Sequence, residues 1–204
     1  MRIITVSREF GSGGREVGKR LADELGFAYY DREIVTAIAE KTRMDEGYVS
    51  NALEGGLFRA VPVHFGRTFS YSTGLMNSTT GLFVEQHKII RELAEKGDCV
   101  IVGRAADAIL GDWKPFNIFV HADLEARVKR CQERAPAGEE LTERELRRQI
   151  KRIDADRARY YELFSDTRWG RMEGYHLCVN TTDCSIKNLV PAIAQYAKAW
   201  LEDR

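Results

Sequence analysis

Short runs of apolar residues recur along this chain, separated by longer stretches in which apolar residues follow helical spacing. Each run is predicted to form a strand, and the five runs lie at 3–6, 27–30, 99–103, 116–121 and 176–180. Apolar residues are almost continuous within them. That is typical of strands covered on both faces, as in a parallel sheet.

Between the strands, apolar residues three or four positions apart predict amphipathic helices. Val17, Leu21 and Leu25 share one helix face, and Gly26 follows as the predicted C-cap. Asp31 is the predicted N-cap of the next helix. The alternation of five strands with helices predicts an α/β fold with a parallel sheet. Further apolar stripes lie at 34–39, 89–93, 124–131 and 186–196.

Two stretches break this rhythm. Residues 44–84 carry Gly, Ser, Thr and aromatic residues without a clean period, and predict a segment inserted over the sheet edge. Residues 135–160 are highly charged after a turn-forming start, and predict a solvated helical hairpin or lid. The aromatic residues of the first stretch are candidates for stacking on an acceptor base or for packing in the core or an oligomer: Phe58, Phe69 and Tyr71.

Composition and charge exclude some classes of partner. The 31 basic and 31 acidic residues balance, which argues against a nucleic-acid partner or an anionic membrane surface. No apolar run approaches the roughly 20 residues that span a bilayer, and the first strand leaves no room for a signal peptide. The four cysteines lack a C-x-x-C pair or a zinc spacing, and a chain of this length needs no disulfide framework, so we expect reduced thiols in the cytoplasm. A homo-oligomer is compatible with the aromatic residues at 58–71.

A glycine-rich turn follows the first strand, and we name residues 9–14 the glycine loop. Gly11, Gly13 and Gly14 allow successive main-chain N–H groups to converge on an anion. The helix that follows presents its own free N–H groups and the positive end of its dipole to the same point. The loop is therefore a candidate phosphate site, and a glycine-rich turn without a ligand is the alternative.

Two alignments of this loop with the motif G-x-x-x-x-G-K-[ST] compete. Residues 13–19 match it formally, but Lys19 then lies on an outward helix face and Arg20 replaces the hydroxyl. In the better alignment Gly14 stands at the lysine position and Glu16 at the magnesium-binding hydroxyl position. Glu16 is then either a Mg²⁺ ligand or a favourable charge in the first helical turn, and Arg8 and Arg15 are the candidates that return the missing positive charge.

Several segments in order resemble the cytidylate kinase-like family, a branch of the P-loop nucleoside-monophosphate kinases. They are "VSREFGSGGREVGKRLA", "YYDREIV", "CVIVGRAADAIL", "NIFVHADLEARVKRCQER" and "IKRIDADRARYY". The resemblance implies one three-layer P-loop kinase domain over 1–204, with 44–84 as the inserted monophosphate-side segment and 135–160 as the lid. It implies transfer of the ATP γ-phosphoryl group with Mg²⁺, nucleotides as substrates, and CMP or dCMP as the first acceptor.

The chain departs from true cytidylate kinases in lacking the loop lysine, in carrying Ala105 after "GR", and in the sequence of 44–84. A nucleotide-binding module without turnover, or a kinase for another acceptor, is therefore the alternative. Arginines recur where phosphoryl transfer would use them, because a guanidinium grips phosphate oxygens in pairs. Asp154 and Asp156 either hold lid arginines or reach Mg²⁺ through water.

The candidate residues fall into three groups. The catalytic candidates are Arg15, Arg104, Arg130 and Arg157. The nucleotide-binding candidates are Arg8, Gly11, Ser12, Gly13, Gly14, Arg15, Glu16, Arg127, Arg134 and Arg152. The substrate-binding candidates are Asp31, Arg104 and Asp107. The alternative role of Arg104 is an ion pair with Asp31 or Asp107, and the alternative role of Asp31 is that of a helix N-cap.

Overall fold

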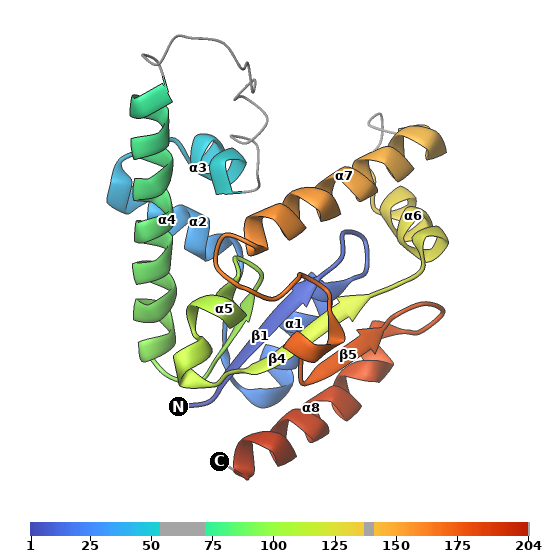
Figure 1. Ribbon diagram of the computed structural model, residues 1–204. Coiled ribbons are helices and arrows are strands. Elements are labelled where there is room, and N and C mark those ends of the chain that lie inside the picture. Colours follow the sequence, from blue (N-terminus) through green and yellow to red (C-terminus); the bar gives the residue numbers. More distant parts are fainter. Residues whose placement is uncertain (54–71, 137–140, 204) are drawn as a thin grey trace.

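Five parallel strands form one sheet in the order β2-β3-β1-β4-β5. The strands β1, β4 and β5 of this sheet are labelled in Figure 1. This computed structural model describes residues 1–53, 72–136 and 141–203, so the aromatic candidates at 58–71 lie outside the described residues. All five predicted strands are confirmed: β1 (Ile3–Arg8), β2 (Ala28–Tyr30), β3 (Cys99–Val102), β4 (Phe116–His121) and β5 (Leu177–Asn180).

The sheet has a topological switch point at its central strand. β1 pairs with β3 on one side and with β4 on the other. The chain thus moves outward in opposite directions from β1, and a crevice opens beyond the carboxyl ends of these strands. The glycine loop begins at the carboxyl end of β1, so the fold places it at this crevice.

Helices cover both faces of the sheet, which confirms the predicted α/β architecture. On one face α1 (Gly14–Leu25) and α8 (Ile186–Glu202) pack against Ile4 and Val6 of β1. On the other face α2 (Arg32–Thr42), α4 (Ser72–Glu95) and α5 (Ala106–Ile109) pack with Ile3 and Ile101. Neighbouring residues of a strand point to opposite faces, so near-continuous apolar runs serve both layers.

A helical hairpin stands over the carboxyl ends of the strands (Figure 1). It consists of α6 (Leu124–Glu133) and α7 (Glu143–Tyr161), which share a small core of Val128, Leu146 and Ile150 with Phe10 of the glycine loop. α7 begins with a capping box, in which Thr142 accepts from the Glu145 N–H group and Glu145 accepts from the Thr142 N–H group. In the charged stretch predicted as a hairpin or lid, residues 135–160, the described residues form a single helix, α7, and α6 precedes the stretch. The lid role stays a prediction.

Of the two predicted helix caps, the C-cap at Gly26 is confirmed, whereas the N-cap at Asp31 lacks the expected side-chain hydrogen bond. Gly26 closes α1 with φ 69°, and its N–H group reaches the carbonyls of Ala22 and Asp23 as a C-cap should. Asp31 precedes α2, but its side chain makes no capping hydrogen bond. It is drawn instead into ion pairs with Arg15 and Arg8.

The irregular pattern at 44–84 hid helices in the described part of that stretch. α3 (Glu46–Leu53) lies within it, and α4 begins at Ser72 rather than near the apolar stripe at 89–93. The first residues of α4 include Ser, Thr and Gly, which have low helix propensity, so the sequence predicts the N-terminal part of this helix only weakly. Two short 3₁₀ turns, η2 (Gly111–Trp113) and η3 (Met172–Gly174), complete the elements of the described residues. No described helix is both long enough and apolar enough to cross a membrane.

Candidate functional site

The glycine loop and the first turn of α1 contain main-chain N–H groups without an acceptor among the described residues. Gly13 precedes α1 with φ 82° and ψ 9°, a left-handed conformation that glycine adopts without strain. Among the described residues, no hydrogen bond engages the N–H groups of Gly11, Gly13, Gly14, Arg15 or Glu16, and the first helical bond runs from the Val17 N–H group to the Gly13 carbonyl. The loop therefore has the free donors that a polyphosphate requires.

The carbonyl side of the loop is held firmly. Arg130 donates from Nη1 to the Gly11 carbonyl at 2.7 Å and from Nη2 to the Thr181 carbonyl at 3.1 Å. Thr181 Oγ1 donates to the Ser12 carbonyl at 2.7 Å, and Ser12 Oγ donates to the Glu9 carbonyl at 2.9 Å. The side chains of Arg130 and Ser12 thus fix the loop conformation. The catalytic role predicted for Arg130, which also lines the larger cavity, and the nucleotide-binding role predicted for Ser12 stay predictions.

Two cavities meet beside the loop. The larger, of about 810 Å³, is lined by the loop, α6 and α7, including Gly11, Gly13, Gly14, Arg130 and Arg134. The smaller, of about 290 Å³, lies toward β3 and α5 and includes Ser7, Arg32, Arg104, Tyr160 and Trp169. Four residues line both cavities and therefore stand where the two meet: Arg8, Phe10, Arg15 and Arg157.

Positive charge is concentrated at this junction. Burial, and after it the charge of Arg157, lowers the pKa of Arg8 from 12.5 to about 9, with Arg104 and Arg15 adding to the effect. Asp31 opposes it, because its carboxylate lies 3.9 Å from Arg8 and 2.5 Å from Arg15. The guanidinium groups of Arg15, Arg104 and Arg157 act on Arg8, and the carboxylates of Asp31 and Asp154 offset part of this charge. This cluster of guanidinium groups is electrostatically suited to anionic phosphate groups.

α7 is joined to the glycine loop by a latch formed by Asp154 and Arg157. Asp154 accepts from the Phe10 N–H group at 2.7 Å and also pairs with the buried Arg127. Arg157 donates to the Arg8 carbonyl at 3.1 Å and lies over the Phe10 ring, 5.6 Å from its centroid. The pairing role is the one that sequence reasoning gave Asp154 as an alternative to Mg²⁺ binding.

Arg104 projects from a strained turn at the end of β3. Gly103, Arg104 and Ala105 all have positive φ, at 74°, 59° and 51°. Left-handed conformations of residues other than glycine cost about 1–3 kcal/mol each and gather at functional sites. The buried Gln86 of α4 supports the turn: it donates to the Arg104 carbonyl at 3.2 Å and accepts from the Tyr160 hydroxyl at 2.6 Å.

Gln86 was missed by the sequence analysis, although a signal existed. It lies on the same helix face as Leu82 and Ile90, and all three are at most 1% exposed. An uncharged polar residue within an apolar stripe is expected to have buried polar partners.

Replacing Gln86 with leucine is expected to destabilise the protein. The change leaves the Arg104 carbonyl and the Tyr160 hydroxyl without this partner, which costs about 2 kcal/mol of unfolding free energy. Urea unfolding measures the loss. Gln195→Leu, at an exposed position of α8, is the control and should change the unfolding free energy by less than about 0.5 kcal/mol.

The remaining candidates divide by their position. Asp107 is 5% exposed, and its carboxylate accepts from the Tyr161 hydroxyl at 2.9 Å. Burial raises its pKa. Asp107 thus lies beneath the site rather than in it. The candidates that line neither cavity are Ser12, Glu16, Asp31, Asp107, Arg127 and Arg152.

Glu16 is engaged by arginines. Its carboxylate accepts from Arg20 at 2.9 Å and from Arg134 at 2.5 Å. Burial alone would raise the pKa of Glu16, but these hydrogen bonds outweigh it and lower the pKa. In the spacing G-K-[ST] the hydroxyl position directly follows the lysine position, so counted from Gly14 it falls on Arg15, one residue before Glu16. A role of Glu16 at Mg²⁺ stays a prediction. The described residues contain no group of three His, Cys, Asp or Glu suited to a metal ion, and we assign Mg²⁺ no protein ligand.

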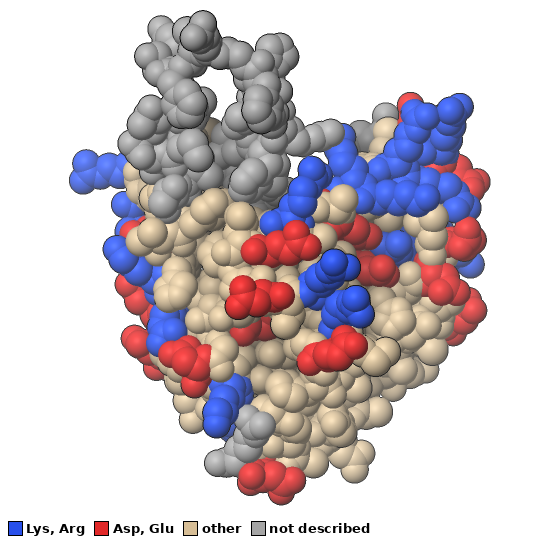
Figure 2. All heavy atoms as spheres, in the orientation of Figure 1, with Lys and Arg blue, Asp and Glu red and all other residues tan. Residues whose placement is uncertain are grey.

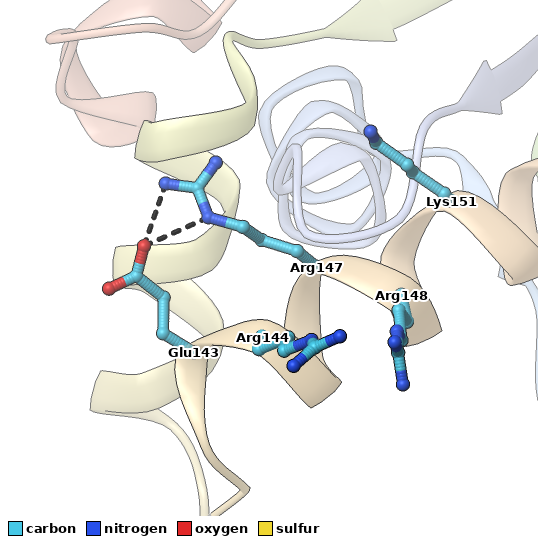
Figure 3. A pocket seen from close by; sticks show the side chains of 5 residues that line it. All are labelled: Glu143, Arg144, Arg147, Arg148 and Lys151. Atoms are coloured by element: carbon cyan, nitrogen blue, oxygen red, sulfur yellow. Dashed lines mark hydrogen bonds and ion pairs between the residues drawn. The ribbon is translucent and has the colours of Figure 1, made fainter.

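A further hollow lies on another face of α7 (Figure 3). It measures about 460 Å³ and is lined by Glu143, Arg144, Arg147, Arg148 and Lys151. Arg147 pairs with Glu143 and with Glu125 of α6, whereas Arg144, Arg148 and Lys151 are exposed. Lys and Arg side chains gather over this end of α6 and α7 at the upper right of Figure 2. This matches the solvated face predicted for the charged stretch.

Comparison with solved structures shows the fold. An uncharacterized protein from Eubacterium ventriosum ATCC 27560 superposes with a TM-score of 0.70 at 23% identity, over 97% of this chain and 99% of that one. Shikimate kinase from Bacteroides thetaiotaomicron superposes with a TM-score of 0.55 at 16% identity, over 98% of both chains. The predicted three-layer P-loop kinase fold is thereby confirmed.

Sequence comparison shows the family. Cytidylate kinase from Salinibacter ruber (strain DSM 13855 / M31) is 26% identical over an alignment of 226 residues, gaps included, that covers 97% of this chain and 97% of that one. The profile of the cytidylate kinase-like family matches residues 3–183, nearly the whole chain. The chain therefore belongs to the cytidylate kinase-like family of nucleotide phosphotransferases, as its motifs predicted.

Proposed function

We propose that this chain transfers the γ-phosphoryl group of ATP to a nucleoside monophosphate, with CMP or dCMP as the first acceptor. One observation supports this most directly: Arg8, Arg15 and Arg157 line both cavities and mark their junction. Phosphoryl transfer requires donor and acceptor phosphates in line with their charge neutralised. A cationic junction between a larger and a smaller cavity is suited to that arrangement.

The residues divide the work as follows. The free N–H groups of the glycine loop bind the donor's phosphates, and Arg104 and Arg32 in the smaller cavity bind the acceptor's phosphate. An oxygen of the acceptor phosphate bonds to the γ-phosphorus, the bond from that phosphorus to the β–γ bridging oxygen breaks, and ADP leaves. α7, latched to Phe10, keeps water from the junction. Mg²⁺ bound with ATP would neutralise further phosphate charge.

The acceptor is tested by incubating the protein with ATP, Mg²⁺ and each of CMP, dCMP, UMP, AMP and GMP. Formation of a nucleoside diphosphate is followed by ³¹P NMR and by chromatography. We expect CDP and dCDP to form fastest. The absence of a diphosphate with every acceptor would refute the kinase proposal.

A nucleotide-binding module without turnover is the second candidate, because Gly14 stands where the loop lysine is expected. Calorimetry distinguishes the two. ATP binding with an affinity typical of a nucleotide site, combined with no diphosphate from any acceptor, would select the module. Product formation would select the kinase.

A further inference from the structure

Relative to the motif G-x-x-x-x-G-K, the glycine and the cation are exchanged between positions 8 and 14 of this chain. In G-x-x-x-x-G-K the first glycine stands six positions before the lysine. With Gly13 and Gly14 in the last two places, the first glycine position falls on Arg8. The chain thus has a cation where the motif has glycine, and a glycine where it has the cation.

The two positions touch, so only one of them can carry a side chain. A Cβ built on Gly14 would lie 2.4 Å from Arg8 Cβ and 2.8 Å from Arg8 Cγ, closer than real Cβ contacts come. Gly14 has no positive φ, so its backbone accepts other residues. The Arg8 side chain is the main obstacle, and Val120 Cβ, at 3.3 Å, is the next and would have to shift slightly. The Arg8 guanidinium in turn lies against Gly103, where a Cβ would be 1.8 Å from Nη1.

We propose that Arg8 takes the place of the loop lysine, and that the chain has exchanged the glycine and the cation between positions 8 and 14. The side chain of Arg8 lies at the junction of the two cavities and is 16% exposed. The other candidate, Arg15, is 60% exposed and pairs closely with Asp31. A guanidinium at this place grips two phosphate oxygens, whereas an ammonium acts as a point charge. The inference rests on the proposed function, in that the ligand is a polyphosphate.

A double-mutant cycle tests the exchange. Arg8→Gly removes the cation, and Gly14→Lys adds one that collides with Arg8. The double variant Arg8→Gly/Gly14→Lys restores the usual motif. Binding of ATP and of inorganic tripolyphosphate is measured by calorimetry, turnover is measured where the wild type shows it, and circular dichroism checks folding. Arg8→Met, which removes the charge but keeps an unbranched side chain, replaces Arg8→Gly as the single variant without charge if the glycine variant does not fold. It does not enter the double variant, because its Cβ and Cγ would still collide with Lys at position 14.

We expect each single variant to lose about 100-fold in tripolyphosphate affinity, and the double variant to return to within about 10-fold of the wild type, because positions in contact couple strongly. Lys19→Ala removes the lysine of the rejected alignment and should bind like the wild type, since Lys19 is 55% exposed and pairs with Asp23.

Additive losses in the double variant, or wild-type affinity in Arg8→Gly or Arg8→Met, would overturn the exchange. Recovery of affinity in a protein that forms no diphosphate would refute the proposed kinase activity and still support the exchange. The experiment can therefore refute the kinase activity without refuting the exchange of residues 8 and 14, and the reverse.

Discussion

Gly103→Ala is expected to lower kcat/KM for phosphoryl transfer about 100-fold, because small displacements of a positioned group have effects of this size. The added Cβ would lie 1.8 Å from Arg8 Nη1 and 2.7 Å from Cζ, so the guanidinium must leave its place. The group that moves is the end of a flexible side chain, and the fold should survive. Steady-state kinetics with saturating acceptor measures the loss, and circular dichroism reports the fold.

Gly26→Ala is the matched control. Gly26 has φ 69°, close to the 74° of Gly103, but nothing lies within 4 Å of a Cβ built there. Both variants suffer the same left-handed backbone strain, of about 1 kcal/mol. Only Gly103→Ala displaces Arg8. Equal losses of activity in the two variants would show that backbone strain, and not the position of Arg8, limits the reaction.

The layered fold could be predicted because its determinants are local. Apolar runs gave the strands, and the three-to-four spacing gave the helices Gly14–Leu25 and Ile186–Glu202. The start of α4 at Ser72 could not be predicted, since its Ser, Thr and Gly residues are poor helix formers. The side-chain role of Asp31 also escaped, because a helix N-cap and an ion-pair partner look alike in sequence.

The parts of the site formed by consecutive residues could be predicted from the sequence. The parts that depend on contacts between residues far apart in the sequence could not. The glycine loop was found from spacing, and its free N–H groups agree with a phosphate site. The distinction between Arg8 and Arg15 depends on Gly103 and Asp31, which the fold brings to β1 from other strands. Exposure of Arg15 and burial of Arg8 could not be read from the loop sequence.

Arg130 illustrates the same limit. Its helical spacing with Arg127 and Arg134 predicted one phosphate-binding face. In the structure Arg130 holds two main-chain carbonyls, Arg127 pairs with Asp154, and Arg134 pairs with Glu16. Guanidinium groups serve main-chain acceptors and carboxylates as well as phosphates. The choice between these partners is made by the loop and by α7, so residue type and spacing leave it open.

Asp154→Ala is expected to destabilise the protein by about 4 kcal/mol, because removing one partner of a buried ion pair leaves the other charge uncompensated. The side chains of Asp154 and Arg127 are 14% and 10% exposed, and the Phe10 N–H group also loses its acceptor. Denaturant unfolding measures the loss. Asp154→Asn keeps an acceptor for Phe10, so its smaller cost separates the charge from the hydrogen bond.

Glu143→Ala provides the exposed counterpart on the same helix. Glu143 pairs with Arg147, but their side chains are 59% and 33% exposed, so the change should cost less than about 1 kcal/mol. If Asp154→Ala cost no more than this control, the latch between α7 and Phe10 would not hold the hairpin over the loop. A large loss confined to Asp154 would show that its buried contacts, with Arg127 of α6 and with the Phe10 N–H group of the glycine loop, stabilise the hairpin.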